Sequence, residues 1–407
     1  RSVVRHELTM VETADYYVSV DGDDGNDGSE TSPLRTVQAA VDRVAAGELI
    51  YVRGGTYDQP YHEPITIEDT AGTESEPIRL EGYPGERPHL RWGGGPGHDD
   101  WQVWGGVVLT GDSPYWAFRN LEVSGSEWCG FQTEGDSNAH SCVFEDLYCH
   151  DLGQKGVWAE TDDCVIRNVE VHDCYNEPSG GEHGDGLGMA GVDGGLIENC
   201  VVYNNSDDGI DLWTSRNVTI RDTVTHSNGY DSDGDGNGFK SANTDEGGAN
   251  EFIRCVSYDN QSRGFRAYSP IADRLVNCTA YNNDSDGFSA IHGGDHEIVN
   301  CLDDGSGTSF HSGVVDSSNS WNLGIDDPGF ASTDPSSDSF LRLAAGSPAI
   351  DAGTDVGLTY SGPAPDLGAY EYDAEGTDDT TDESMWGPVT IYYHTGEEFV
   401  EVAIKNT

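Results

Sequence analysis

The chain has 407 residues, and 74 Asp and Glu stand against only 20 Lys and Arg, which gives a formal net charge of −54. A surface this acidic repels phosphate backbones and anionic bilayers, so we expect neither nucleic acid nor a membrane as a partner. The 9 Trp, 19 Tyr and 11 Phe, with regular hydrophobic runs between them, predict a folded chain. No apolar run approaches the ~20 residues that span a bilayer.

Lysine is almost absent, occurring only at Lys155, Lys240 and Lys405. An acidic excess with so little lysine is typical of proteins from salt-loving organisms, whose dense carboxylates keep the surface hydrated in brine. The sequence shows no signal peptide, so we expect either the mature form of a secreted protein or a cytosolic one.

The first elements can be predicted in chain order. Residues 1–15 are expected to be an N-terminal tail, and the stretch TADYYVSVDG predicts a first strand where the tail ends. Residues 36–45 then place Val37, Ala40, Val41 and Val44 at helical spacing. We expect this amphipathic helix to cap the open N-terminal end of the domain that follows, as terminal repeats require.

A repeat organises the middle of the chain. Eight segments, from AFRNLEVSG to IVNCLDDGS, align in steps of 22 to 32 residues. The shared column consists of Leu121, Leu147, Val169, Cys200, Thr223, Cys255, Cys278 and Cys301. This period with short alternating strands indicates a solenoid, and nothing helical or leucine-framed recurs. The predicted fold is all-β, a right-handed parallel β-helix over residues 16–372.

A second column consists of glycines. Its members are Gly130, Gly156, Gly186, Gly209, Gly238, Gly264, Gly287 and Gly313. An apolar residue follows each glycine, and strand alternation turns that residue inward and its neighbours outward. The glycine is predicted to lie at a bend between two sheets, where side chains would crowd. The longer steps mark loops around 175–184 and 228–237, which could form the sides of a binding site.

The nine cysteines fit no metal-binding motif. Those in the first column are expected to be small buried hydrophobes. The less regular ones leave room for one disulfide among Cys129, Cys142, Cys149, Cys164 and Cys174. Beyond the solenoid, residues 373–385 are predicted to be an acidic linker, and residues 386–407 a β-hairpin extension.

The outward positions beside the glycines bring acidic residues together. Asp185, Asp207, Asp208 and Asp211 are expected to gather on two adjacent coils, which lie ~4.8 Å apart. Four such carboxylates repel one another unless a cation holds them, and ligands that are all oxygen suit Ca²⁺. The alternative is an ordinary acidic surface, since most loops of this chain are acidic.

Lys240 and two arginines continue the same face. Lys240 and Arg266 stand two residues after their glycines, and Arg263 stands one before. A lysine beside a divalent cation and an arginine is pushed toward its neutral form, which makes it a general base. With Arg263 and Arg266 binding substrate, this set suits β-elimination of an anionic uronate polysaccharide. The alternative is a salt bridge from Lys240 to Asp211, with the arginines neutralising acidic neighbours.

One further acidic loop invites a calcium interpretation. Asp231, Asp233 and Asp235, followed by Gly236, match the first half of an EF-hand loop. The twelfth position is Ala242, where an EF-hand needs a bidentate Glu, so the loop is not an EF-hand. A second calcium beside the site stays open as an alternative.

Three segments carry a family resemblance: NNSDDGIDLW (204–213), GNGFKSAN (236–243) and SRGFRAYS (262–269). They resemble the family 9 pectate lyases, calcium-dependent parallel β-helix enzymes with a lysine base. The resemblance implies Ca²⁺ ligands at Asp185, Asp207, Asp208 and Asp211. It also implies that Lys240 is the base. Arg266 departs from the acidic or amide residue expected there, which puts the preference for homogalacturonan in doubt.

Two other function classes remain open. A polygalacturonase-like hydrolase would use the clustered Asp185, Asp207 and Asp208, although the Arg-x-Lys motif of such enzymes is absent and Lys240 would have no role. A non-enzymatic carbohydrate-binding β-helix would need neither the lysine nor a product. For the favoured lyase we expect an acidic uronate polysaccharide as substrate, secretion, and a monomer.

Overall fold

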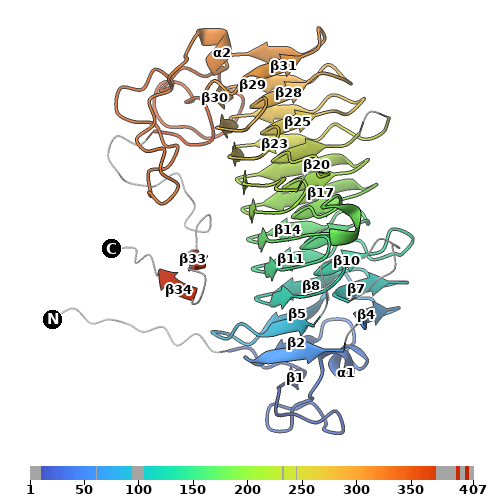
Figure 1. Cartoon of the computed structure of the whole chain (residues 1–407). Helices are drawn as coiled ribbons and strands as arrows, with labels where there is room; N and C mark the ends of the chain where they lie inside the picture. Colours follow the sequence, from blue (N-terminus) through green and yellow to red (C-terminus); the bar gives the residue numbers. More distant parts are fainter. Residues whose placement is uncertain are drawn as a thin grey trace, which may run out of the picture.

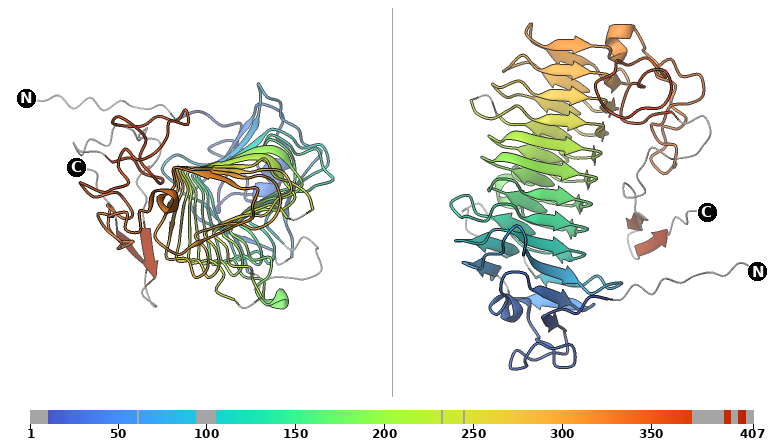
Figure 2. Two further views of the ribbon diagram at one scale, coloured as in Figure 1. Left: turned by 90° about the horizontal axis from the view of Figure 1, so that it is seen from above. Right: turned by 180° about the vertical axis from the view of Figure 1, so that it is seen from behind.

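The computed structural model describes residues 11–60, 62–93, 105–231, 233–243 and 245–372, and the backbone of 391–394 and 399–402. The described chain is a stack of coils with three parallel sheets running along it (Figure 1), and the coils superimpose when viewed along the stack (Figure 2). This confirms the predicted all-β parallel β-helix. The predicted linker, 373–385, and the first ten residues of the predicted tail lie outside the described residues.

Sheet 1 has twelve strands, each hydrogen-bonded to the next coil. Its strands are β1 (Tyr16–Val18), β2 (Leu49–Val52), β5 (Ile78–Gly82), β8 (Trp116–Arg119), β11 (Val143–Glu145), β14 (Val165–Arg167), β17 (Asp193–Glu198), β20 (Arg216–Arg221), β23 (Glu251–Ile253), β26 (Arg274–Val276), β29 (Glu297–Val299) and β32 (Val315–Ser317).

Sheet 2 has ten strands and carries the candidate site. Its strands are β4 (Ile65–Glu68), β7 (Val107–Thr110), β10 (Phe131–Thr133), β13 (Val157–Ala159), β16 (Leu187–Met189), β19 (Ile210–Leu212), β22 (Phe239–Ser241), β25 (Phe265–Ala267), β28 (Phe288–Ala290) and β31 (Thr308–Phe310).

Sheet 3 also has ten strands. They are β3 (Thr56–Gln59), β6 (His89–Trp92), β9 (Glu122–Ser124), β12 (Tyr148–His150), β15 (Glu170–His172), β18 (Val201–Tyr203), β21 (Val224–His226), β24 (Val256–Tyr258), β27 (Thr279–Tyr281) and β30 (Leu302–Asp303). A separate antiparallel pair, β33 (Ile391–His394) and β34 (Phe399–Val402), falls in the predicted C-terminal hairpin.

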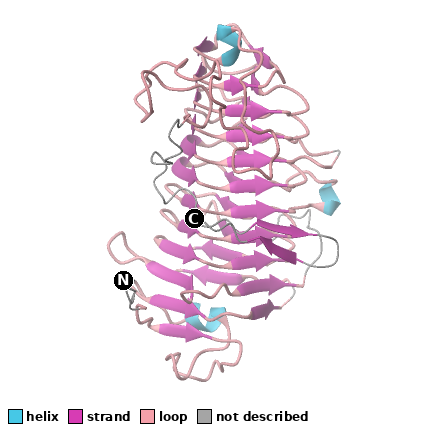
Figure 3. Cartoon of the chain, turned by 90° about the vertical axis from the view of Figure 1, so that its left-hand side faces the viewer, coloured by secondary structure: helices cyan, strands magenta, loops and turns pink. Residues whose placement is uncertain are grey.

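Helix is confined to short pieces in the described chain (Figure 3): α1 (Val37–Val41), α2 (Ser320–Leu323) and a 3₁₀ turn, η1 (Glu177–Ser179). The predicted capping helix is present but shorter than 36–45. The Thr36 side chain caps α1 by accepting from Ala39 N, and Val37, Ala40 and Val41 are buried. No described helix is both long and apolar enough to cross a membrane.

The first repeat column marks the bend from sheet 1 to sheet 3. The residue before each column member has a positive φ, for example 54° at Asn120 and 52° at Asn199. Asn and Asp tolerate this left-handed conformation better than most residues, and they hold seven of the eight positions from Asn120 to Asn300; Arg254 holds the eighth.

The glycine column marks the entry into sheet 2, and crowding explains it. At Gly238 an added Cβ would lie 2.0 Å from Ser257 Oγ, and at Gly186 it would lie 2.0 Å from a Val202 methyl. The assignment of Gly313 was wrong. In the last coil β31 begins at Thr308, which pairs with Phe288, so Gly307 holds the column position.

The core is built from stacked rows of like residues. Phe239, Phe265 and Phe288 stack at centroid distances of 4.8 and 4.9 Å. A buried row of amides runs beside them: Asn205 donates to Asn228, Asn228 to Asn260 and Asn260 to Asn283, at 2.9–3.0 Å. All nine cysteines are buried and free, so the disulfide that the sequence left open is not formed.

Residues 318–372 leave the stack. α2 closes the C-terminal end of the core, where Trp321 contacts Phe288 and Phe310, and the rest packs against the outer face of sheet 3 (Figure 2). Phe340 contacts Tyr258 edge-on at 4.8 Å, and Leu341 and Ala369 are buried beside it. The Asn277 side chain ties the segment down by donating to the Asp366 carbonyl at 3.0 Å. Sheet 2 is not covered by this segment.

Candidate active site

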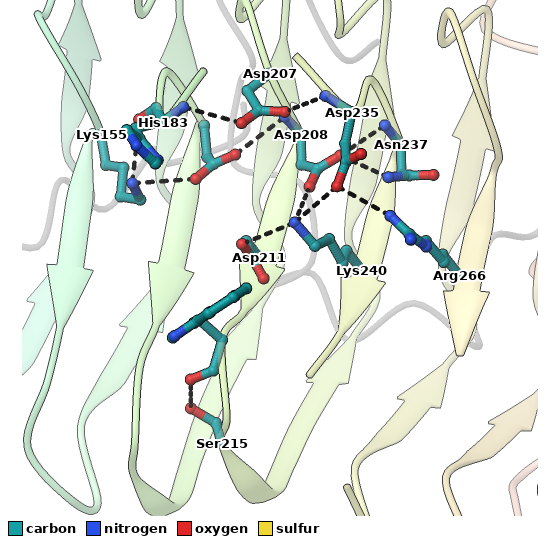
Figure 4. A network of polar contacts seen from close by, with 12 residues as sticks. Lys155, His183, Asp207, Asp208, Asp211, Ser215, Asp235, Asn237, Lys240 and Arg266 are labelled. Carbon is teal, nitrogen blue, oxygen red and sulfur yellow. Dashed lines mark hydrogen bonds and ion pairs between the residues drawn. The ribbon is translucent and has the colours of Figure 1, made fainter. Parts of the chain in front are cut away.

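The predicted outward ladder of sheet 2 is present. Parallel pairing places Asp211 of β19 opposite Lys240 of β22, and Lys240 opposite Arg266 of β25. The ladder ends against small residues, with Gly188 before Asp211 and Ser289 after Arg266. Figure 4 shows these side chains on the same face as the carboxylates that precede the glycines.

Three carboxylates converge beside this ladder. One oxygen each of Asp185, Asp208 and Asp211 lies within 4.8 Å of the others, and all three residues are buried. The Asp208 carboxylate is held by Asn237, whose backbone and side-chain N–H groups donate to Oδ1 at 2.7 and 2.8 Å. Burial raises the pKa of Asp211 to about 7, although Lys240 opposes the shift. Burial likewise raises the pKa of Asp208.

Asp207, the fourth predicted ligand, lies next to this group but is not part of it. Its two oxygens accept backbone N–H groups, from His183 at 3.0 Å and from Asp235 at 2.5 Å. Burial, and then the charges of Asp185 and Asp208, raise the pKa of Asp207 to about 9. The two donors lie in the predicted insertion loops 175–184 and 228–237, so both loops do flank the site.

Lys240 lies at the centre of the carboxylates. Its Nζ lies 3.0 Å from Asp208 Oδ2, 3.2 Å from Asp211 Oδ2 and 3.1 Å from Asp235 Oδ2. Burial lowers the pKa of Lys240, but the charges of Asp208 and Asp211 outweigh burial and raise it far above the usual value. The expectation of a neutral lysine assumed a divalent cation beside it, and the carboxylates acting alone have the opposite effect.

Asp235 is a site residue whose role the sequence did not reveal. It was considered only as part of an EF-hand-like loop, yet its Oδ2 bridges Lys240 at 3.1 Å and Arg266 at 2.9 Å. Burial opposes ionisation of Asp235, but the two cations outweigh it and lower the pKa. Its position depends on how the loop 228–237 folds back, which no periodic pattern encodes.

The two predicted substrate arginines differ in their surroundings. Arg266 donates to Asp235 and lies 4.4 Å from the centroid of the Tyr268 ring. Arg263 lies one coil beyond Asn237 and faces Asp286, with 3.8 Å between Nε and Oδ2. Arg266 is therefore joined to the Lys240 network, whereas Arg263 flanks it.

Lys155 is a second buried lysine at the site. Its Nζ lies 3.1 Å from Asp185 Oδ2, donates to the His183 carbonyl at 3.1 Å, and lies 4.4 Å from the Trp158 ring centroid. The sequence holds a signal for it, since Lys155 precedes a column glycine as Asp185 does, but that position was attributed to chance. Gly188 makes room for the ring, because a Cβ there would lie 2.4 Å from Trp158.

Trp213 is the exposed aromatic residue nearest in sequence to the ladder. It follows β19, is 46% exposed, and its ring lies 5.9 Å from Lys240 Nζ. An exposed indole beside a charged site offers an apolar surface to a sugar ring. The motif NNSDDGIDLW contains this residue, and the alternation that turns Asp211 outward also turns Trp213 outward, although it was not assigned to the site.

The carboxylate group fits an oxygen-liganded cation. Asp185, Asp208 and Asp211 supply up to six oxygens, within the number that Ca²⁺ accepts. Asp211 Oδ1 is buried without a hydrogen-bond partner among the described residues, so this oxygen is available to a cation. Together with the raised pKa values, this indicates a site built for positive charge.

Comparisons with known proteins agree with this geometry. A family model described as "Pel9A-like, right handed beta helix region" matches residues 16–307, and it gives the hand of the solenoid that the repeat predicted. Pectate lyase PEL9 of Emericella nidulans is 32% identical over 289 residues, covering 62% of this chain and 69% of that protein. Pectate lyase L of Dickeya chrysanthemi is 29% identical over 397 residues, covering 88% and 90%.

Solved structures show the same relationship. The crystal structure of pectate lyase Pel9A superimposes with a TM-score of 0.76 at 27% identity, covering 88% of this chain and 96% of that one. A rhamnogalacturonan lyase shares the fold, with a TM-score of 0.68 at 21% identity, covering 81% and 96%. The family model spans most of the solenoid, including every element of the site. The chain therefore belongs to the Pel9A-like right-handed β-helix family and is an enzyme of the pectate lyase type.

Proposed function

We propose that this enzyme cleaves polygalacturonate by calcium-dependent β-elimination, with Lys240 as the general base. The observation that carries the proposal is the register of sheet 2, which places Lys240 between Asp211 and Arg266 on three neighbouring strands. The names of the pectate lyase relatives support the substrate class. A hydrolase would leave the buried Lys240 without a role, and a binding module would need no base.

The chemistry follows from the positions of these groups. Calcium held by Asp185, Asp208 and Asp211 would bind the uronate carboxylate and stabilise the enolate-like charge. Lys240 takes the proton alpha to that carboxylate, the electron pair forms a carbon–carbon double bond, and the bond to the leaving oxygen breaks. The leaving oxygen takes a proton from solvent.

The protein side chains prepare this step in two ways. Lys240 can lose its proton only when the carboxylates around it are neutralised, which couples the base to occupation of the aspartate group. Arg266 would exchange its contact with Asp235 for one with a substrate carboxylate, and Arg263 would extend this contact along the stack. Asp207 stays a predicted fourth ligand. To bind the cation, its carboxylate would have to break one of its hydrogen bonds to the backbone N–H groups of His183 and Asp235.

The test is ultraviolet absorbance of polygalacturonate incubated with the protein, first with calcium and then with excess chelator. We expect calcium-dependent growth of the unsaturated-product band, abolished by the chelator. New reducing ends without that band would establish hydrolysis and overturn the proposal. Methyl-esterified pectin and alginate as parallel substrates would show whether Arg266 moves the preference away from polygalacturonate.

The remaining features belong to the same proposal. Polygalacturonate is a polysaccharide found outside cells, so we propose that the enzyme is secreted. We also propose that it works as a monomer. The net charge of −54 would favour activity in concentrated salt, where screening reduces repulsion between the enzyme and its polyanionic substrate.

A further inference from the structure

A second group of metal-binding side chains lies on sheet 3, away from the aspartates of sheet 2. His89 on β6, Glu122 on β9 and His150 on β12 come from three successive coils. One ligand atom of each lies within 4.8 Å of the other two. Their side chains are 19%, 26% and 16% exposed, so the group is reachable from solvent yet largely fixed by its neighbours.

The distances from the Glu122 carboxylate to the two imidazoles match those of a tetrahedral metal site, and the two imidazole nitrogens lie within 4.8 Å of each other. Glu122 Oε1 lies 3.2 Å from His89 Nδ1 and 3.3 Å from His150 Nε2. In a tetrahedral site with metal–ligand bonds of ~2.0–2.1 Å, neighbouring ligand atoms are roughly 3.3 Å apart. A cation seated among these three atoms would therefore need little rearrangement of the side chains.

The other nitrogen of each imidazole ring already has a partner. His150 Nδ1 lies 2.7 Å from Asp151 Oδ2, and His89 Nε2 lies 2.6 Å from Ser124 Oγ. Metal-binding histidines are held by such outer partners, which fix the ring orientation and the tautomer. Here they leave His89 Nδ1 and His150 Nε2 directed at the same carboxylate oxygen.

The surroundings restrain the group further. The His150 ring stacks on His172 of the next coil, with 5.4 Å between centroids and 9° between planes. Arg91, which lies beside Ser124 in the register, is paired with Asp58 at 2.7 Å. The imidazole ring of His150 is thus held in place before a cation binds. The positive charge of Arg91 is neutralised by Asp58.

We infer that His89, Glu122 and His150 form a binding site for one divalent transition-metal cation, for which Zn²⁺ is the natural probe. Two imidazoles and one carboxylate suit Zn²⁺, with water in the fourth position, whereas Ca²⁺ prefers oxygen ligands alone. The chain therefore sorts two metals by ligand type on two different sheets. The zinc links β6, β9 and β12 and stabilises the N-terminal part of the stack, and it takes no part in cleavage.

The experiment uses the full chain without a histidine tag, stripped of metal and then saturated with Ca²⁺ to occupy the aspartates. Zn²⁺ is titrated by calorimetry and by competition with a chromophoric chelator, and melting is followed with and without Zn²⁺. We expect one Zn²⁺ per chain and a rise in Tm. His89→Ala and Glu122→Gln should each lower the affinity by about 100-fold or more, and Asp151→Asn by about 10-fold.

His172→Gln is the matched control. His172 Nδ1 lies 2.7 Å from Asp173 Oδ2, as His150 lies from Asp151, but its Nε2 meets the Tyr148 hydroxyl at 2.8 Å and no carboxylate. This variant keeps all three ligand atoms and loses only the ring stacked on His150, so its Zn²⁺ affinity should fall by about 10-fold at most. A wild-type protein that takes up no Zn²⁺ under saturating Ca²⁺ overturns the inference, and so does a folded His89→Ala or Glu122→Gln protein with unchanged affinity.

Discussion

Replacing Lys240 by Met tests the centre of the proposed mechanism, because it removes the ammonium group and keeps most of the side-chain volume. A positioned general base contributes ~10²–10⁴-fold to the rate, equivalent to about 3–5 kcal/mol of activation free energy. We therefore expect kcat on polygalacturonate at saturating calcium to fall by that factor. Initial rates of the ultraviolet band measure it directly.

The same substitution has a consequence for stability. Without the ammonium group, the carboxylates of Asp208, Asp211 and Asp235 face one another, and Asp208 is fully buried. Breaking a buried ion pair in this way lowers the free energy of unfolding by about 3–5 kcal/mol. That loss should be measured by denaturant unfolding with chelator present. Added calcium should restore more stability to the variant than to the wild type.

Lys155→Met supplies the control for both effects. Lys155 is equally buried and contacts the same carboxylate group through Asp185, but it lies outside the ladder of Asp211 and Arg266. We expect it to lose stability while kcat changes by less than about 10-fold. A Lys240→Met enzyme with wild-type kcat, or equal losses of kcat in the two variants, would refute the assignment of Lys240 as the base.

Four further outcomes are expected. Arg266→Gln should raise KM for polygalacturonate by roughly 10- to 150-fold with kcat nearly unchanged, because one charge-assisted contact is worth about 1.5–3 kcal/mol; a lower kcat with unchanged KM would contradict the substrate-binding role. Asn228→Ala should lower the free energy of unfolding by about 3 kcal/mol, since it leaves the amides on both adjoining coils without their partner. Gly238→Ala should cost about 3 kcal/mol or fail to fold, because its Cβ would overlap Ser257 Oγ. Asp303→Asn should stabilise the protein at pH 8. Burial raises the pKa of Asp303 to about 6, so its contribution is complete below pH 4 and is lost as the pH rises through 6. The variant's advantage in the free energy of unfolding, about 3 kcal/mol at most, should be absent at pH 4 and level above pH 7 in thermal melts; an advantage independent of pH would exclude this cause.

The fold and the ladder could be predicted because parallel coils repeat one register. Once the glycine column was aligned, Asp211, Lys240 and Arg266 had to lie side by side, and they do. The column failed only in the last coil, where a short step brings Gly307 into place of Gly313. Residues 318–372 do not repeat, so their packing on sheet 3 could not be derived.

The finer parts of the site depend on loops and on charge balance. Asp235 reaches Lys240 because the loop 228–237 folds back, and Asp207 turns toward backbone donors in both flanking loops. The sequence does not show that three carboxylates surround the Nζ of Lys240, so it could not reveal that they raise its pKa when no cation is bound. The balance between burial and several neighbouring charges depends on distances, which only the three-dimensional structure gives.

The position of the site along the stack has a consequence for how the enzyme loses activity. Each coil pairs only with the coils before and after it, so unfolding can proceed from the two ends inward. The strands that carry Asp185, Asp211, Lys240 and Arg266 lie fifth to eighth among the ten of sheet 2, counted from the N-terminal end. Loss of the first coils would leave every site residue paired on both sides, whereas the C-terminal edge lies only two strands from Arg266. Partial unfolding at the N-terminal end should therefore be silent in an activity assay, and fraying at the C-terminal end should be the first structural loss that the assay detects.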